Sequence, residues 1–183
     1  MIPNLLQTET TMKNYFTLLF ILFLFTGANA QTGNSKPALL EKIHWIIERS
    51  DMNSVRQKFK EICDENHFPS IVSGLKDGFY QGASPADDYG YRHEVTFEMK
   101  NGKMISVDYD EIHTDGHAKQ RDEEYCQQML QSGTTPAIAY PTYESGMLIK
   151  QNFNEVDAVS GASYSLYRFK LAILYAILNA GQL

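Results

Sequence analysis

The residues best suited to chemistry lie in one stretch near the C-terminus, residues 157–165. The stretch reads Asp-Ala-Val-Ser-Gly-Ala-Ser-Tyr-Ser and leads into an apolar segment, residues 166–180. The start of a helix leaves backbone N–H groups unpaired and carries partial positive charge, so it can hold a phosphate. Gly161 and Ala162 would let a ligand approach the backbone closely, and Ser163 would present an alcohol oxygen. The stretch therefore predicts a phosphate-binding turn.

The same stretch also allows a purely structural interpretation, a loop followed by an N-cap, because Ser is a preferred cap. Ser160 is predicted to support the turn by hydrogen bonding to the backbone. Ser165 is expected in the first helical turn, with its side chain facing away from the loop. Asp157 is expected to shape the turn, because its negative charge would repel a phosphate. The candidates for stacking on a bound ring are Tyr140, Tyr143, Met147 and Tyr164.

Composition excludes several classes of function. The chain has 183 residues, 43% of them hydrophobic, which is enough for one domain with a sizeable core. A net charge of −6 and the lack of a basic run argue against a nucleic acid or an anionic membrane as partner. The sequence contains no dinucleotide-binding glycine motif, no P-loop and no hydrolase nucleophile elbow.

The N-terminus predicts an export signal in residues 1–30, with Met12 as the true start. Residues 15–25 form an apolar core that is too short to span a bilayer, and Ala28-Asn29-Ala30 is a cleavage site of small residues. The alternative is an anchor that stays attached. Because Gln31 would begin the mature chain, no lipid-anchor cysteine is expected, and the protein is predicted to be periplasmic or secreted without stable membrane insertion.

Two cysteines, Cys63 and Cys126, would meet an oxidising compartment after export. A disulfide between them is one option. A buried free thiol is favoured, because Cys63 lies on the apolar face of a predicted helix.

Other titratable residues suggest no metal centre. His113 and His117 are four residues apart, but Asp115-Gly116 between them indicates a turn, and no third ligand is in register. His44 is expected at the surface or as a satisfied core residue. A solvated acidic edge is expected for Asp108, Asp110 and Glu111.

Hydrophobic periodicity predicts an α+β fold, a small antiparallel sheet covered by helices. Residues 31–75 form a helical segment of two helices, the second capped by Asn53 or Ser54. A hairpin is predicted over residues 95–109, turning at Asn101-Gly102, with alternate residues on one buried face. The inward residues of its second strand would be Ile105, Val107 and Tyr109.

Three further helices are predicted towards the C-terminus. The composition of residues 121–130 is helical, and Pro141 is expected to begin another short helix. The last helix, residues 166–179, is apolar nearly all round and should be buried against the sheet.

Four segments in this order resemble the FMN-binding domain family. Asp77-Gly78-Phe79-Tyr80-Gln81-Gly82 resembles the Asp-Gly-x-Tyr-x-Gly opening of extracellular members, and the hairpin with its Asn101-Gly102-Lys103-Met104 tip is similar to their central hairpin. Residues 107–111 with Asp115-Gly116, and the Ser-Gly-Ala-Ser turn, complete the set. The resemblance covers residues 76–183. The family includes flavin subunits of sodium-pumping NADH:quinone reductase and secreted electron-transfer modules.

The resemblance implies an exported electron carrier whose FMN is attached covalently through a phosphoester to Ser163. The family's usual acceptor is Thr. A flavin transferase is an implied partner, while the redox donor and acceptor stay open. The alternative is a flavin-free or non-covalent small-molecule binding module of the same fold. A flavin reductase with its own donor site is disfavoured by the missing dinucleotide motif.

Overall fold

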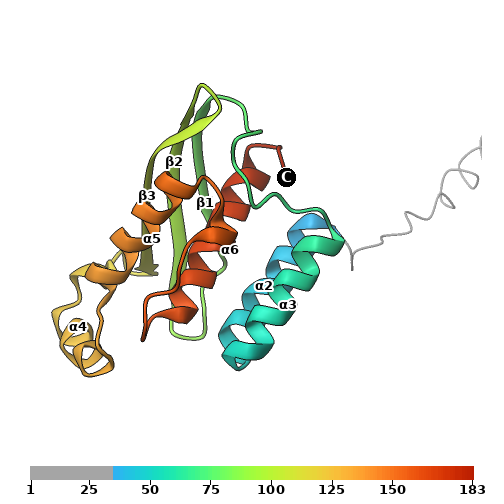
Figure 1. The fold of residues 1–183 in the computed structure, drawn as a ribbon. Coiled ribbons are helices and arrows are strands. Elements are labelled where there is room, and N and C mark those ends of the chain that lie inside the picture. The colour runs from blue at the N-terminus through green and yellow to red at the C-terminus, as the bar shows by residue number, and fades with distance from the viewer. Residues whose placement is uncertain (1–34) are drawn as a thin grey trace, which may run out of the picture. The chain divides into compact units, whose positions relative to one another are not determined.

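A computed structural model describes residues 35–183, shown in Figure 1. The predicted signal peptide, residues 1–30, lies outside the described residues. Two neighbouring helices come first, α2 (Lys36–Arg49) and α3 (Met52–Glu65). Three strands follow: β1 (Gly78–Ala83), β2 (Tyr91–Lys100) and β3 (Lys103–His113). The remaining elements are η1 (Lys119–Arg121), α4 (Glu123–Met129), η2 (Leu130–Ser132), α5 (Pro136–Lys150), η3 (Phe153–Glu155) and α6 (Ser163–Asn179).

The strands form one antiparallel sheet in the order β1-β2-β3, and helices cover one of its faces. Helix α6 packs on β1 and β2, α5 packs on β3, and α2 and α3 pack against α6. The predicted α+β fold is therefore confirmed. Among the described residues, no helix is both long and apolar enough to cross a membrane.

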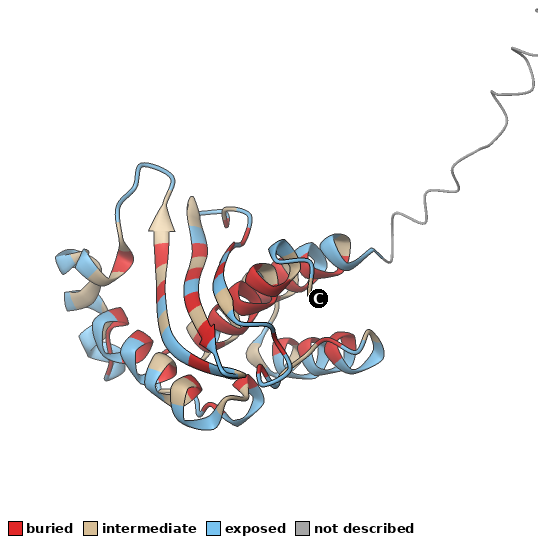
Figure 2. Ribbon diagram, turned by 90° about the horizontal axis from the view of Figure 1, so that it is seen from above, coloured by how far each residue is buried: buried red, intermediate tan, exposed pale blue. Residues whose placement is uncertain are grey.

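Helix α6 lies at the centre of the core, as its composition predicted. Buried side chains run along it, and Figure 2 shows this continuous buried stretch between the sheet and the N-terminal helices. Burial on both sides explains why the helix lacks a polar face, since a helix that is apolar all round must be covered all round.

Close contact between β1 and α6 depends on Gly82. A Cβ built at Gly82 would meet the backbone N of Ala176 and lie 2.7 Å from the carbonyl oxygen of Ala172. Backbone atoms cannot move aside as a flexible side chain can. The last glycine of the Asp-Gly-x-Tyr-x-Gly segment is thus required by packing.

Replacing Gly82 with alanine is therefore expected to lower the free energy of unfolding by about 1–3 kcal/mol, the usual cost of overpacking. Urea denaturation measures this change. Gly74→Ala is the matched control, because a Cβ there meets nothing within 4 Å. Equal stability of the two variants would contradict this account of the contact.

Asp77 holds the tip of the hairpin in place. Its carboxylate accepts hydrogen bonds from the backbone N–H groups of Asn101, at 2.9 Å, and Gly102, at 3.2 Å. Both of those residues have positive φ, as a two-residue hairpin turn requires. The hairpin predicted from Asn101-Gly102 is confirmed. Asp77 directly precedes β1, so its hydrogen bonds link the start of that strand to the hairpin turn.

Several local predictions were wrong. The cap of α3 is Asp51, not Asn53 or Ser54, because the Asp51 carboxylate accepts the N–H groups of both. Helix α5 begins at Pro136, the first proline available, so Pro141 lies inside it. Ile105 is exposed, because an irregularity between Glu98 and Met99 shifts the register and turns Met104 inward instead.

The two cysteines are free, and Cys63 is buried, which confirms the favoured interpretation. The predicted turn between His113 and His117 is also confirmed, with Gly116 in a left-handed conformation at a φ of 91°.

Candidate functional site

The turn before α6 has the geometry that the sequence predicted. Ser163 is the first residue of α6, and no side chain caps that helix among the described residues. Gly161 has a φ of 83°, in the left-handed region that favours glycine. A Cβ at Gly161 would lie 2.7 Å from the carbonyl oxygen of Ser132 and 3.3 Å from Cγ2 of Thr134. The turn therefore contacts the segment that leads into α5 and needs a glycine to do so.

Some residues of the turn are exposed to solvent, and one buried residue accepts a hydrogen bond from the core. Asp157 and Ser160 are exposed, while Ser163 and Ser165 are half-buried. Ala162 is buried, and its carbonyl oxygen accepts a 2.7 Å hydrogen bond from the hydroxyl of Tyr143. The site residues predicted from sequence thus differ in accessibility, from the exposed Asp157 and Ser160 to the buried Ala162.

The four side chains proposed to stack on a ring divide into two groups. Tyr140, Tyr143 and Met147 are at most 1% exposed, so they belong to the core. Tyr164 is exposed, and its hydroxyl donates a 3.0 Å hydrogen bond to the carbonyl oxygen of Ser50, which follows α2. Only Tyr164 is placed to reach a ligand at the surface.

A wide hollow of about 800 Å³ lies beside the start of α5. Thr135, which borders it, directly follows Thr134, the residue in contact with the Gly161 turn. The other residues around it are Gln120, Arg121, Glu123, Glu124, Cys126, Gln127 and Ala137. The turn before α6 is thus linked through Thr134 and Thr135 to an open hollow, which α4 also borders.

A network of buried charges involves the second turn of α6, which follows the residues just described. Arg168, in the second turn of α6, donates to Glu48 of α2 at 2.5 and 2.9 Å and to Glu111 of β3 at 3.3 Å. Glu111 also accepts a 2.6 Å hydrogen bond from Lys119, and Glu48 contacts His93 at 3.1 Å. Two carboxylates thus face the side chains of Arg168 and Lys119, and the network ties α2, β2, β3 and η1 to α6.

This network corrects the expectation that Glu111 lies on a solvated acidic edge. Glu111 is fully buried, because it follows Tyr109 by two residues and shares its inward face. It is also the register partner of His93 on β2, which is equally buried. Sequence reasoning missed Glu48, His93, Glu111 and Arg168 as one group, although strand alternation places two of them inside.

Ionisation of the two carboxylates is strongly favoured. Burial opposes the charged form of Glu48, but hydrogen bonds from His93 and Arg168 outweigh burial and lower its pKa to about 2. Burial likewise opposes ionisation of Glu111, yet the charges of Arg168 and Lys119 hold its pKa well below the usual range. Burial lowers the pKa of His44, and the neighbouring His93 lowers it further.

Stability is therefore expected to fall in acid. Both carboxylates have a lower pKa in the folded chain than in the unfolded chain, so their stabilisation is complete above about pH 4.5. It is lost as the pH falls from 4.5 towards 2, which for Glu48 corresponds to about 3 kcal/mol. Urea denaturation at a series of pH values measures the slope. Glu48→Gln should make that slope shallower, and an unchanged slope would contradict the assignment.

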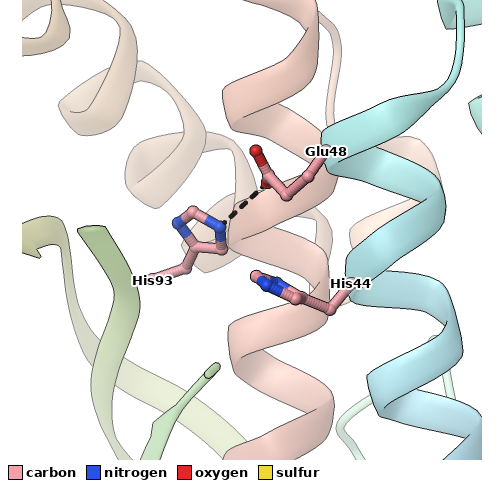
Figure 3. Close-up of side chains that lie close together, drawn as sticks. All are labelled: His44, Glu48 and His93. Carbon is pink, nitrogen blue, oxygen red and sulfur yellow. Dashed lines mark hydrogen bonds and ion pairs between the residues drawn. The ribbon is translucent and has the colours of Figure 1, made fainter. Parts of the chain in front are cut away.

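His44, Glu48 and His93 also form a group of potential metal ligands, drawn in Figure 3. Each offers a ligand atom within 4.8 Å of the others. Both ring nitrogens of His44 and Nδ1 of His93 are buried with no hydrogen-bond partner among the described residues. These are donor types that zinc accepts. However, both oxygens of Glu48 already accept hydrogen bonds from Arg168, whose charge opposes a cation, so we assign the group to the buried network.

Comparison with known proteins places the chain in a family. It is 36% identical over 106 residues to the 15 kDa lipoprotein of Treponema pallidum, a match that spans 56% of this chain and 72% of that protein. The chain belongs to the family of this 15 kDa lipoprotein. A crystal structure of the CPE2226 protein from Clostridium perfringens is also similar, with 31% identity and a TM-score of 0.53. It covers 59% of this chain and 92% of that one. No protein-family model matches the sequence.

Membership of the 15 kDa lipoprotein family bears on location. A lipoprotein is an exported protein, which agrees with the export predicted from the N-terminal sequence. The same relationship gives no support to the expectation that this chain lacks a lipid anchor.

Proposed function

We propose that this protein is an exported FMN carrier that relays electrons in the periplasm or outside the cell. The observation that carries the proposal is the position of Ser163, the first residue of a 17-residue helix without a side-chain cap. A left-handed glycine two residues earlier brings the chain into that position. The resemblance of the Ser-Gly-Ala-Ser turn to that of the FMN-binding domain family adds the identity of the cofactor.

The turn and the helix suit a phosphate. The N–H groups of Ser163, Tyr164 and Ser165 have no intrahelical acceptor, because they belong to the first turn of α6. Together with the helix dipole they favour a dianion at this point. The hydroxyl of Ser163 is the proposed phosphoester oxygen. Gly161 and Ala162 provide clearance, and Ser160 and Asp157 remain at the exposed edge of the turn.

The isoalloxazine ring is proposed to lie on the α4 side of the turn, in the hollow bordered by Thr135. The hydroxyl of Tyr164 is bonded to Ser50, which follows α2, so this side chain would limit the proposed ring site on the α2 side. The flavin supplies the redox chemistry, while the protein supplies attachment and orientation. The attachment point would be the first residue of α6, a helix whose later turns are buried in the core.

Covalent attachment suits an exported carrier. Occupancy of a reversible site falls as free ligand becomes dilute, and a phosphoester does not dissociate. The proposal requires a flavin transferase as partner, as well as redox partners of unspecified identity. The alternative is a flavin-free or non-covalent binding module of the same fold, favoured by the presence of Ser163 where Thr is usual.

Coexpression with a flavin transferase tests the proposal. We expect a flavin absorption band that survives denaturation and desalting, and a peptide containing residues 157–165 that carries the mass of FMN. A band that is lost on denaturation would support the non-covalent module. No flavin in either form, despite an active transferase, would overturn the carrier proposal.

A further inference from the structure

A second cavity, which no residue of the turn at residues 157–165 lines, lies between α3 and α6 beside η3. Its volume is about 250 Å³. Helix α3 contributes the cationic and aromatic residues of one wall, and α6 contributes those of the other. The residues that matter to its chemistry are Arg56, Phe59, Lys60, Cys63, Tyr167 and Lys170.

Lys170 is the unusual residue of this cavity. It is only 6% exposed, yet it makes no ion pair or hydrogen bond within residues 35–183. Its ammonium nitrogen lies 5.0 Å from the centre of the Tyr167 ring, the one specific contact it has there. By contrast, the buried Lys119 is paired with Glu111. Lys170 therefore points an unpaired cation into a cavity.

Nothing in the cavity wall neutralises this cation. Burial raises the pKa of the Cys63 thiol to about 12, so that it stays uncharged at neutral pH. Asp64, also in the wall, is already paired with Lys60. Arg56 adds a further positive charge, so the cavity is net cationic. Burying an unpaired charge is costly. Binding of an external anion next to Lys170 would offset that cost.

The remaining walls are aromatic. Phe59 and Tyr167 lie edge to face, with ring centroids 5.2 Å apart. The volume is slightly below the range of typical small-molecule sites, about 300–1,000 Å³. A ligand of this size can carry one anionic group and a small apolar body.

We infer that the cavity between α3 and α6 binds a small organic anion, a carboxylate or phosphate ester with a ring-sized apolar body, and that Lys170 is its counter-ion. The apolar body would contact Phe59 and Tyr167, and Arg56 would attract the anion from the entrance. This site is independent of the proposed flavin attachment, because no residue of the turn lines it.

Calorimetric titration of the flavin-free protein with benzoate and with phenyl phosphate tests the inference, with benzyl alcohol as the neutral comparison. We expect at least one of the two anions to bind and the alcohol to bind much more weakly. Lys170→Met should reduce affinity about 10-fold to 100-fold, the usual contribution of a charged hydrogen bond. Lys58→Met is the matched control, since Lys58 is exposed on α3 outside this cavity, and it should bind as the parent does.

A measurement on the unmodified sequence protects the test against a variant that fails to fold. Burial lowers the pKa of Lys170 to about 8, which isolates its titration from that of ordinary lysines. In protein labelled with carbon-13 lysine, the bound anion should raise that pKa. Binding of neither anion, equal binding by Lys170→Met, or a Lys170 pKa that does not respond would each overturn the inference. None of these outcomes would affect the coexpression test of the proposed FMN attachment.

Discussion

Replacing Arg168 with methionine is expected to lower the free energy of unfolding by about 3–5 kcal/mol. Arg168 pairs with both Glu48 and Glu111, which are 5% and 0% exposed at their side chains. Methionine fills a similar volume but leaves Glu48 without its permanent cation. The cost comes from the unpaired buried carboxylate more than from the lost attraction. Urea denaturation at pH 7 measures the change.

Arg49→Met provides the control. Arg49 pairs with Asp88 at 2.9 Å, but both side chains are more than half exposed. Exposed pairs contribute about 0–1 kcal/mol, so this variant should remain close to the parent. Similar losses in the two variants would show that burial does not set the strength of the Arg168 pairs.

Replacing Ser163 with alanine is expected to abolish covalent FMN completely while leaving the chain folded. The variant removes the one hydroxyl at the first position of α6, and no other group replaces its oxygen there. The structural cost is small, because Ala162, not Ser163, occupies the N-cap position. The measurement is peptide mass spectrometry after coexpression with a flavin transferase, with circular dichroism to confirm folding.

Three neighbouring variants sharpen this test. Ser163→Thr should keep the flavin, because it preserves an alcohol at the same point. Ser160→Ala and Ser165→Ala should also keep it, since their hydroxyls lie before the glycine and within the first turn. FMN mapped to Ser160 or Ser165 would contradict the proposed role of Ser163.

Sequence patterns predicted the elements that depend on local chemistry. The hairpin followed from Asn101-Gly102, and the buried last helix followed from its lack of charges. The turn before α6 followed from Gly161, whose left-handed conformation few other residues adopt. In each case the signal that allowed the prediction lies within a few residues of the sequence.

The buried charges could not be predicted in the same way. Glu48, Glu111 and Arg168 come from α2, β3 and α6, and their pairing depends on how these elements pack. Taken singly, a glutamate at a strand end is most often solvated. Strand alternation could have placed Glu111 inside with Tyr109, but only packing supplies its partner. The Ile105 error has a similar origin, because no local signal marks the register shift.

The central place of α6 has a consequence for the order in which the molecule can form. Of the helices in residues 35–183, α6 is the last in chain order, yet α2 and β1 both pack against it. Until residues 163–179 have left the ribosome, the apolar faces of those earlier elements have no surface to cover them. Contacts between such distant segments also form slowly. The nascent domain thus remains without its core until α6 is available to cover these earlier elements.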